Sequence, residues 1–373
     1  MTRRVVFFVT HLMGSGHLVR TIALARAVTE AGGEATVISG GRSLPHVDLS
    51  GPRLIQLPPV MSDGLDYARL LTPEGVPAGS AYLAARRETL LAALATTRPD
   101  VLVTETWPFG RRVLAEEFAA AAEAARARGA ALWASIRDVL EPPKKARRAD
   151  ETLSRLAPFA GVLVHGDPAV APLSLSWPGP HEGAEARFAR LAPRLAYTGY
   201  VASPLPAPIP SQDILVATGG GVIGRALLDL AARASALSTR PWRLRVGGPD
   251  AAAQIARLSA LGPAIAEPAA PDYRARLAGA AASISLCGYN TAVETALAGT
   301  PALLVPMEEK NEQEQLIRAA AFARLPELET ARLADLTPET LAARAEALAA
   351  APRRSAALKA DGAAEAARLF LKT

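Results

Sequence analysis

Short apolar runs alternate with segments of helical spacing along most of the chain. The first run, Val5 to Thr10, has the length and composition of a strand that is covered on both faces. Beyond it, apolar positions from Leu18 to Val28 recur every three or four residues, and Gly32 and Gly33 end this pattern. The run from Ala35 to Ser39 then predicts a second strand. This order of strand, turn, helix and strand predicts a parallel sheet of the α/β class.

The same alternation continues to the end of the chain. Further strands are predicted at residues 53–57, 101–104, 131–136, 161–165, 195–198, 213–217, 243–246, 264–266, 283–286 and 302–305. Helices are predicted at residues 81–97, 111–128, 225–237, 251–261, 272–280, 291–298, 312–321, 338–350 and 356–371. Two doubly wound domains are therefore expected, with a central cleft between their sheets and helices that close the C-terminus.

The boundary between the halves is a stiff segment in which proline stands at every second position from Pro204 to Pro210. We predict an N-terminal, acceptor-side domain at residues 1–203, a proline-rich hinge at 204–210 and a donor domain at 211–352. The remaining residues, 353–373, are predicted to form a helix that packs back on the first domain.

Composition adds a cellular setting to this outline. Half of the residues are apolar and 21% are charged, which is typical of a globular core, and the single cysteine, Cys287, excludes an internal disulfide. The N-terminus is too soon polar for a signal peptide, so a cytoplasmic protein is predicted. The net charge of +5 is spread over helix faces, which argues against a nucleic-acid groove. The dense run from Lys144 to Arg148 predicts either an exposed helix start or a peripheral contact with an anionic inner-membrane surface.

A glycine-rich turn follows the first strand, where open α/β sheets bind ligands. It contains Gly14, Gly16 and His17, but Val19 stands where a dinucleotide fingerprint has its third glycine. A dinucleotide oxidoreductase is therefore disfavoured. His17 has two interpretations: a structural histidine at the helix start, or a general base at near-neutral pH.

Three further polar residues stand at the predicted carboxyl ends of strands in the first half. These candidate acceptor-side residues are Glu105, Arg137 and His165. Because parallel strands end at one edge of a sheet, they are expected near His17. For Glu105, a helix-capping or loop carboxylate is the structural alternative.

The second half contains a glycine loop and a pair of helix starts. Thr218, Gly219, Gly220 and Gly221 lie between a strand and a helix, so their backbone N–H groups can approach a phosphate; packing is the alternative. Between Cys287 and Ala319, two helix N-termini are predicted side by side, which favours an anion such as a diphosphate. The polar residues expected to face this region are Asn290, Thr291, Glu294, Glu314 and Gln315, and Gly288 allows the tight turn that precedes the first of these helices in the donor site. A carboxylate here can bind a ribose diol.

Together these landmarks resemble the GT-B glycosyltransferases, and within them the MurG-type group of N-acetylglucosaminyltransferases and its uncharacterised relatives. The likeness rests on Gly14 to His17, Thr218 to Gly221, Glu294 before Gly299-Thr300-Pro301, and Glu314 to Ala319, in the family's order. The chain departs from the family pattern in three places. The N-terminal loop lacks the additional glycines and is flanked by Met13 and Leu18, Val293 replaces a serine, and Arg318 replaces an asparagine.

The resemblance implies transfer of a sugar from a nucleoside diphosphate, expected to be UDP, to an acceptor hydroxyl. Inversion and independence from metals and cofactors are expected, with His17 as the base. The glycine loops would bind the diphosphate, Glu294 the ribose, and Glu314 with Gln315 the sugar. Three alternatives stay open. Gly16 to Arg20 also looks like the G-H-x-x-R of PseG-type nucleotide-sugar hydrolases, and an epimerase or a non-catalytic nucleotide-sugar-binding protein has the same ligand.

Overall fold

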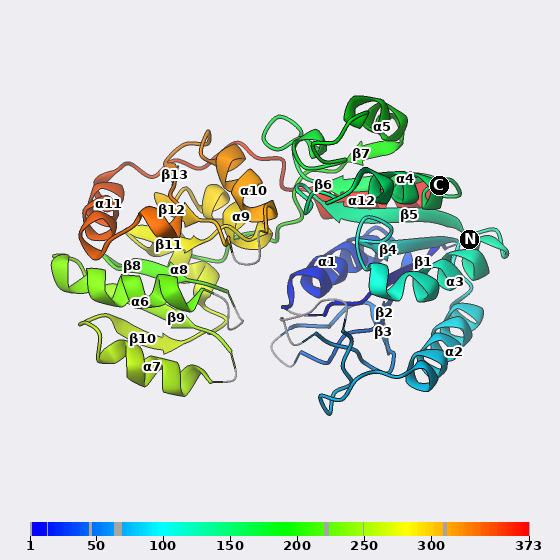
Figure 1. The fold of residues 1–373 in the computed structure, drawn as a ribbon, viewed down its shortest axis with the longest axis horizontal. Coiled ribbons are helices and arrows are strands. Elements are labelled where there is room, and N and C mark those ends of the chain that lie inside the picture. The colour runs from blue at the N-terminus through cyan, green and yellow to red at the C-terminus, as the bar shows by residue number, and fades with distance from the viewer. Residues whose placement is uncertain are drawn as a thin grey trace. The chain divides into compact units, whose positions relative to one another are not determined.

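A computed structural model describes residues 2–12, 14–44, 47–62, 69–219, 224–248, 250–308 and 312–372. The chain divides into two compact units, Met1–Val201 together with Lys359–Thr373, and Ala202–Leu358 (Figure 1). None of the described helices has the length and apolar character needed to cross a membrane.

The first unit contains a seven-stranded parallel sheet in the order β3-β2-β1-β4-β5-β6-β7. Its strands are β1 (Arg4–Val9), β2 (Glu34–Ser39), β3 (Arg53–Gln56), β4 (Val101–Glu105), β5 (Ala131–Arg137), β6 (Gly161–His165) and β7 (Leu195–Tyr197). The helices are α1 (Gly16–Glu30), α2 (Ser80–Thr97), α3 (Ala115–Arg126), α4 (Ala146–Arg155), α5 (Ala184–Leu191) and α12 (Gly362–Lys372).

The apolar run of β1 is continuous because both faces of the strand are covered. Val6 and Phe8 join the core formed with α2 and α3, whereas Val5, Phe7 and Val9 join the core formed with α1 and α12. Successive side chains on a strand point to opposite faces, so alternate residues supply the two cores. Figure 1 shows α12, in red, returning to this unit, where Phe370 meets Phe7 edge to face at 5.7 Å.

The second unit contains a six-stranded parallel sheet in the order β10-β9-β8-β11-β12-β13. Its strands are β8 (Ile214–Ala217), β9 (Trp242–Val246), β10 (Ile265–Pro268), β11 (Ala282–Leu286), β12 (Ala302–Val305) and β13 (Leu328–Thr330). Its helices are α6 (Arg225–Ala234), α7 (Ala251–Ser259), α8 (Tyr273–Gly279), α9 (Tyr289–Ala298), α10 (Glu314–Phe322) and α11 (Pro338–Ala350). Thr337 caps α11 in a capping box.

The predicted α/β class and parallel sheets are confirmed, but several element boundaries differ. The helix predicted from residue 111 starts as a 3-10 turn at Arg112–Leu114, because Arg111 takes a left-handed conformation with φ of 57°. The helix predicted from residue 356 begins only at Gly362. Residues 356–360 are not helical, and the N–H of Ala356 donates to the backbone oxygen of Ala296 instead of taking part in a helix. α5 and β13 were not predicted; both are short, and the strand is only three residues long.

Candidate active site

His17 lies in the first turn of α1, immediately after the glycine turn that follows β1. Its Nδ1 lies 2.9 Å from Oε1 of Glu105, at the end of β4, and its side chain keeps 17% of its surface exposed. Nδ1 donates to the carboxylate, so Nε2 carries the lone pair, and within the described residues Nε2 makes no hydrogen bond. Gly14, which precedes this turn, has a φ of 31°. The geometry thus presents one basic nitrogen at the carboxyl edge of the sheet.

The charge of His17 is set by its surroundings. Burial and then the positive charge of Arg111 lower its pKa to about 3, while the hydrogen bond to Glu105 acts in the opposite direction. Arg137, at the end of β5, adds to the lowering. The imidazole is therefore neutral at physiological pH, which is the form that accepts a proton.

Glu105 is buried and surrounded by donors. Arg20, one turn along α1 from His17, forms an ion pair with Oε1. Ser135 donates to Oε2 at 2.7 Å, and Thr106 donates to Oε1 at 3.2 Å. Burial alone would raise the pKa of Glu105, but the charge of Arg20 and the hydrogen bond from His17 hold it well below its ordinary value. The carboxylate is therefore a fixed negative charge behind His17.

A second histidine stands behind this carboxylate. Ser135 donates to Glu105, so its Oγ must accept from Nε2–H of His165, 3.0 Å away. Nδ1 of His165 then accepts from Thr198 at 2.8 Å. Burial and then the positive charge of Arg20 lower the pKa of His165 to about 3, so it stays neutral. His165 has no exposed surface, and it supports Glu105 through Ser135.

In the second unit, Glu294 lies on α9, which begins after Gly288 without a side-chain cap. Asn290 and Thr291 occupy its first turn. Glu294 keeps 20% of its side chain exposed and lies 3.0 Å from Nε of Arg274. Burial raises its pKa, and the positive charge of Arg274 opposes that shift only in part. This carboxylate has few partners and stands close to a helix N-terminus.

Glu314 and Gln315 have different environments, although both begin α10. Glu314 is buried and accepts from Nη2 of Arg318 at 2.9 Å. Arg318 has no exposed surface and also donates to the backbone oxygen of Cys287 at 3.2 Å. Gln315 is half-buried and its Oε1 accepts from the backbone of Met307 at 3.2 Å. The side chain of Cys287 is buried and forms no disulfide.

The glycine loop of the second unit is described only in part. Thr218 and Gly219 follow β8, and Gly219 has a φ of 88°, a conformation that favours glycine. A Cβ added at Gly219 would meet no atom of the described residues within 4 Å. Gly220 and Gly221 lie outside the described residues.

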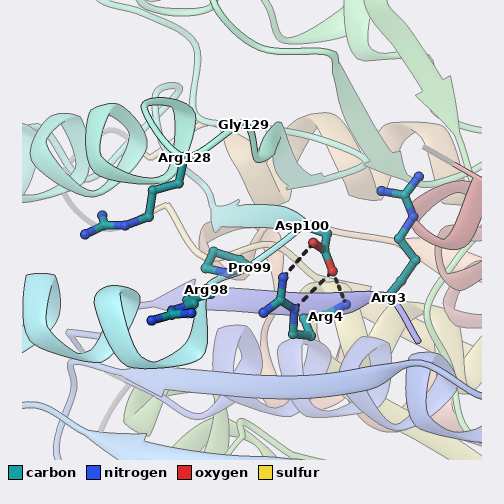
Figure 2. Close-up of a pocket in the computed structure, with 7 residues that line it drawn as sticks. All are labelled: Arg3, Arg4, Arg98, Pro99, Asp100, Arg128 and Gly129. Carbon is teal, nitrogen blue, oxygen red and sulfur yellow. Dashed lines mark hydrogen bonds and ion pairs between the residues drawn. The ribbon is translucent and has the colours of Figure 1, made fainter. Parts of the chain in front are cut away.

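A basic hollow lies at the opposite end of the first sheet, where β1, β4 and β5 begin. Arg4 pairs with Asp100 there, and Figure 2 shows Arg3 and Arg128 directed to opposite sides of that pair. Arg98 ends α2, and Arg128 donates to the oxygen of Ala124 in α3. Arginines at helix C-termini are explained by the negative dipole end. Parallel sheets bind ligands at the other edge, so this hollow is not the active site.

Sequence reasoning did not single out Arg20, Ser135 or Arg274. Arg20 stands three residues after His17, a spacing that places both on one helix face and was the available signal. The partners of Ser135 and Arg274 come from distant segments, which no local pattern reveals. Among the described residues, no three His, Cys, Asp or Glu side chains gather as metal ligands would.

Comparison with known proteins agrees with this architecture. Residues 248–373 match the glycosyltransferase family 28 C-terminal domain. The crystal structure of Acinetobacter baumannii MurG superposes with a TM-score of 0.60 at 16% identity, covering 99% of this chain and 100% of that one. CalG4, the calicheamicin glycosyltransferase, gives a TM-score of 0.59 at 17% identity over 100% of this chain and 95% of that one. The fold is therefore GT-B, the two-domain α/β class of these glycosyltransferases.

Within this class the chain resembles the MurG-type group. It is 36% identical over 168 residues to the UDP-N-acetylglucosamine--N-acetylmuramyl-(pentapeptide) pyrophosphoryl-undecaprenol N-acetylglucosamine transferase of Methylobacterium sp. (strain 4-46), covering 42% of this chain and 44% of that protein. The enzyme of the same name from Rhodopseudomonas palustris (strain BisA53) is 32% identical over 175 residues, covering 45% and 47%. The match thus spans less than half the length of these curated relatives.

Proposed function

We propose that this protein is a glycosyltransferase that moves a sugar from a UDP-sugar donor to an acceptor hydroxyl. The observation that carries the proposal is His17, held through Nδ1 by the buried Glu105 carboxylate, with Nε2 left as the proton acceptor. The family 28 domain at residues 248–373, and the UDP-N-acetylglucosamine named for the curated relatives, support the donor.

In the proposed reaction, Nε2 of His17 takes the proton of the acceptor hydroxyl. The acceptor oxygen attacks the anomeric carbon from the face opposite the diphosphate, so the configuration inverts. The carbon–oxygen bond to the diphosphate breaks, and its electron pair leaves with the UDP. Glu105 stabilises the imidazolium that forms on His17, as a buried carboxylate beside an imidazole does.

In this reaction, backbone N–H groups bind the leaving diphosphate. The N-terminus of α9 after Gly288 and the loop at Gly219 offer N–H groups to the developing charge. Glu294 accepts from the ribose hydroxyls. We assign the donor sugar to Gln315 with Glu314, of which Glu314 is committed to Arg318 in this structure. This arrangement stabilises the charge without a metal or a cofactor, so we expect chelators to leave turnover unchanged.

The decisive experiment replaces His17 with alanine. We expect turnover to fall by about 10²- to 10⁴-fold, because general base catalysis is lost. UDP affinity, measured by calorimetry, should stay within about twofold of the original, because the proposal assigns His17 to the acceptor proton and not to the nucleotide. A tenfold change in affinity would correspond to about 1.4 kcal/mol. His181→Ala is the matched control, because Nε2–H of His181 donates to the backbone oxygen of Pro143 and makes no hydrogen bond to Glu105 among the described residues. Normal turnover in His17→Ala would refute the base assignment.

The same preparation separates transfer from hydrolysis. The protein is incubated with a UDP-sugar in the absence of acceptor, and UDP release is followed. A glycosyltransferase releases UDP slowly under these conditions, because water is a poor substitute for the bound acceptor. Release as fast as turnover with acceptor would identify a nucleotide-sugar hydrolase instead.

We also propose that the basic run before α4 contacts an anionic membrane surface. Lys144 and Lys145 are exposed. Burial and then the charge of Arg148 lower the pKa of Arg112, so Arg112 and Arg148 lie close together. Val113 beside them is 38% exposed. Sedimentation with phosphatidylglycerol vesicles should fall several-fold in a Lys144→Glu, Lys145→Glu variant. Equal sedimentation of both proteins would overturn this contact.

A further inference from the structure

Arg274, on α8, is the partner of Glu294, on α9. Its Nε lies 3.0 Å from Oε1 of the glutamate, and the side chains are 27% and 20% exposed. A half-buried ion pair of this kind fixes the position of a carboxylate, because each charge lowers the cost of burying the other. Sequence reasoning assigned the ribose to Glu294 and did not anticipate the arginine.

The same guanidinium reaches the segment that enters this unit. Its Nη2 donates to the backbone oxygen of Ser203 at 2.6 Å and to that of Pro204 at 3.1 Å. Further along, the N–H of Ile209 donates to the oxygen of Ala275 at 2.9 Å, so the proline-rich segment is held against α8 at both ends. Arg274 therefore links a candidate ligand-binding carboxylate to the backbone at the start of the unit.

The carboxylate keeps acceptor capacity for a ligand. Nε of Arg274 faces Glu294 as an ion pair but forms no hydrogen bond among the described residues. The hydroxyl of Tyr273, also on α8, is buried and has no hydrogen-bond partner among the described residues. The charge of Glu294, together with burial, raises the pKa of Tyr273, which places the two groups in one neighbourhood. An ionised carboxylate has about four acceptor positions, so two ribose hydroxyls can be accommodated.

We propose that Arg274 is a positioning residue for the nucleotide: it holds the carboxylate of Glu294 charged and in place to accept from the ribose hydroxyls. This inference rests on the proposed function, since it takes a nucleoside diphosphate as the ligand of Glu294. Arg274 itself need not touch the nucleotide. Its contacts with Ser203 and Pro204 keep the guanidinium from turning away from the carboxylate.

The test compares two probes that differ in one ribose hydroxyl, UDP and 2′-deoxy-UDP. Dissociation constants for both are measured by calorimetry on the full chain and on Arg274→Gln. We expect the original protein to prefer UDP by about tenfold, the typical effect of one hydrogen bond to a charged group. In Arg274→Gln this preference should fall to about twofold or less, because the uncompensated buried glutamate becomes protonated or moves. Arg274→Lys, which keeps the charge, should restore part of it.

Arg276→Gln is the matched control, because Arg276 lies on the same helix but pairs with Asp272. It should keep the full preference for UDP. A preference in Arg274→Gln equal to that of the original protein would overturn the positioning role and leave the proposed function intact. Tighter UDP binding by Arg274→Gln would also overturn it, by showing that the arginine competes with the ribose. If the original protein binds UDP without preference, the ribose contact of Glu294 is refuted, and if it binds no UDP, the proposed donor is refuted as well.

Discussion

Glu105 in the first unit and Glu294 in the second are both glutamates that face an arginine, yet their pKa values are shifted in opposite directions. The pKa of Glu105 lies well below its ordinary value, because the charge of Arg20 and the hydrogen bond from His17 outweigh burial. The pKa of Glu294 is raised, because burial outweighs the single ion pair with Arg274. Their side chains are 3% and 20% exposed.

The number of donors around each carboxylate explains the difference. His17, Arg20, Thr106 and Ser135 all contact Glu105, so its oxygens are occupied before any ligand arrives. Such a group acts through its neighbours, here by stabilising charge on His17. Glu294 has open acceptor positions, which suit the hydroxyls of a ligand. Glu105 is thus placed to support the base His17, whereas Glu294 is placed to bind a substrate directly.

The largest expected effect is that of Glu105→Gln. We expect turnover to fall on the order of 10³-fold, because the imidazolium loses its stabilising charge and the imidazole its fixed tautomer. The free energy of unfolding should fall by about 3 kcal/mol, because the buried Arg20 loses its ion pair with Glu105. UDP affinity should not change. Turnover is measured under saturating donor, and stability is measured by urea unfolding.

A second buried pair in the same unit provides the matched control. Glu117 accepts from Nε and Nη2 of Arg86 at 2.6 and 3.0 Å, away from His17. Glu117→Gln should lose similar stability but keep turnover within about threefold. If Glu105→Gln and Glu117→Gln lost turnover equally, the loss in Glu105→Gln would come from reduced stability alone. Glu105 would then have no separate role in supporting His17.

The stability that Glu105 contributes to the fold should decrease at low pH. The folded pKa of Glu105 lies below its ordinary value of 4.5, so its contribution is fully present above that value and is lost as the pH falls toward the folded pKa. The gap in unfolding free energy between the original protein and Glu105→Gln should therefore narrow below pH 4.5. A constant gap down to pH 2.5 would contradict the lowered pKa.

A smaller effect is expected from Glu294→Gln, and the property affected should be the binding of UDP. UDP affinity should weaken by about tenfold, because hydrogen bonds to a charged acceptor are replaced by weaker neutral ones. Since the folded pKa of Glu294 is raised, its charge costs stability at neutral pH. The free energy of unfolding should thus stay equal or rise by less than about 1 kcal/mol. Calorimetry measures the UDP affinity, and urea unfolding measures the stability. If Glu294→Gln destabilised the protein as much as Glu105→Gln, the two carboxylates would not differ in the way described.

Periodicity and strand-end logic predict the strands and the edge at which His17 and Glu105 meet. They succeed because β1 and β4 are buried runs whose parallel order follows from the intervening helices. They do not predict which side chains donate hydrogen bonds to which carboxylate. Arg20 and Glu105 are 85 residues apart, and Ser135 and Glu105 are 30 apart, so those contacts depend on strand order and side-chain packing. Ser135 in particular resembles any small residue within a buried strand.

The smallest expected effect, that of Ser135→Ala, probes how far the support of His17 extends. Removing the hydroxyl leaves Oε2 of Glu105 and Nε2–H of His165 without their shared partner. Turnover should fall by about three- to tenfold at unchanged KM, and stability by about 1 to 2 kcal/mol, the usual cost of an unpaired buried group. Ser283→Ala is the matched control, because the buried Ser283 hydroxyl has no hydrogen-bond partner among the described residues, and it should change neither quantity. Histidine-selective ¹⁵N NMR of the five histidines reports the tautomers directly. If His165 kept its Nε2–H signal unshifted and turnover were unchanged in Ser135→Ala, the support of His17 would end at Glu105 and Arg20.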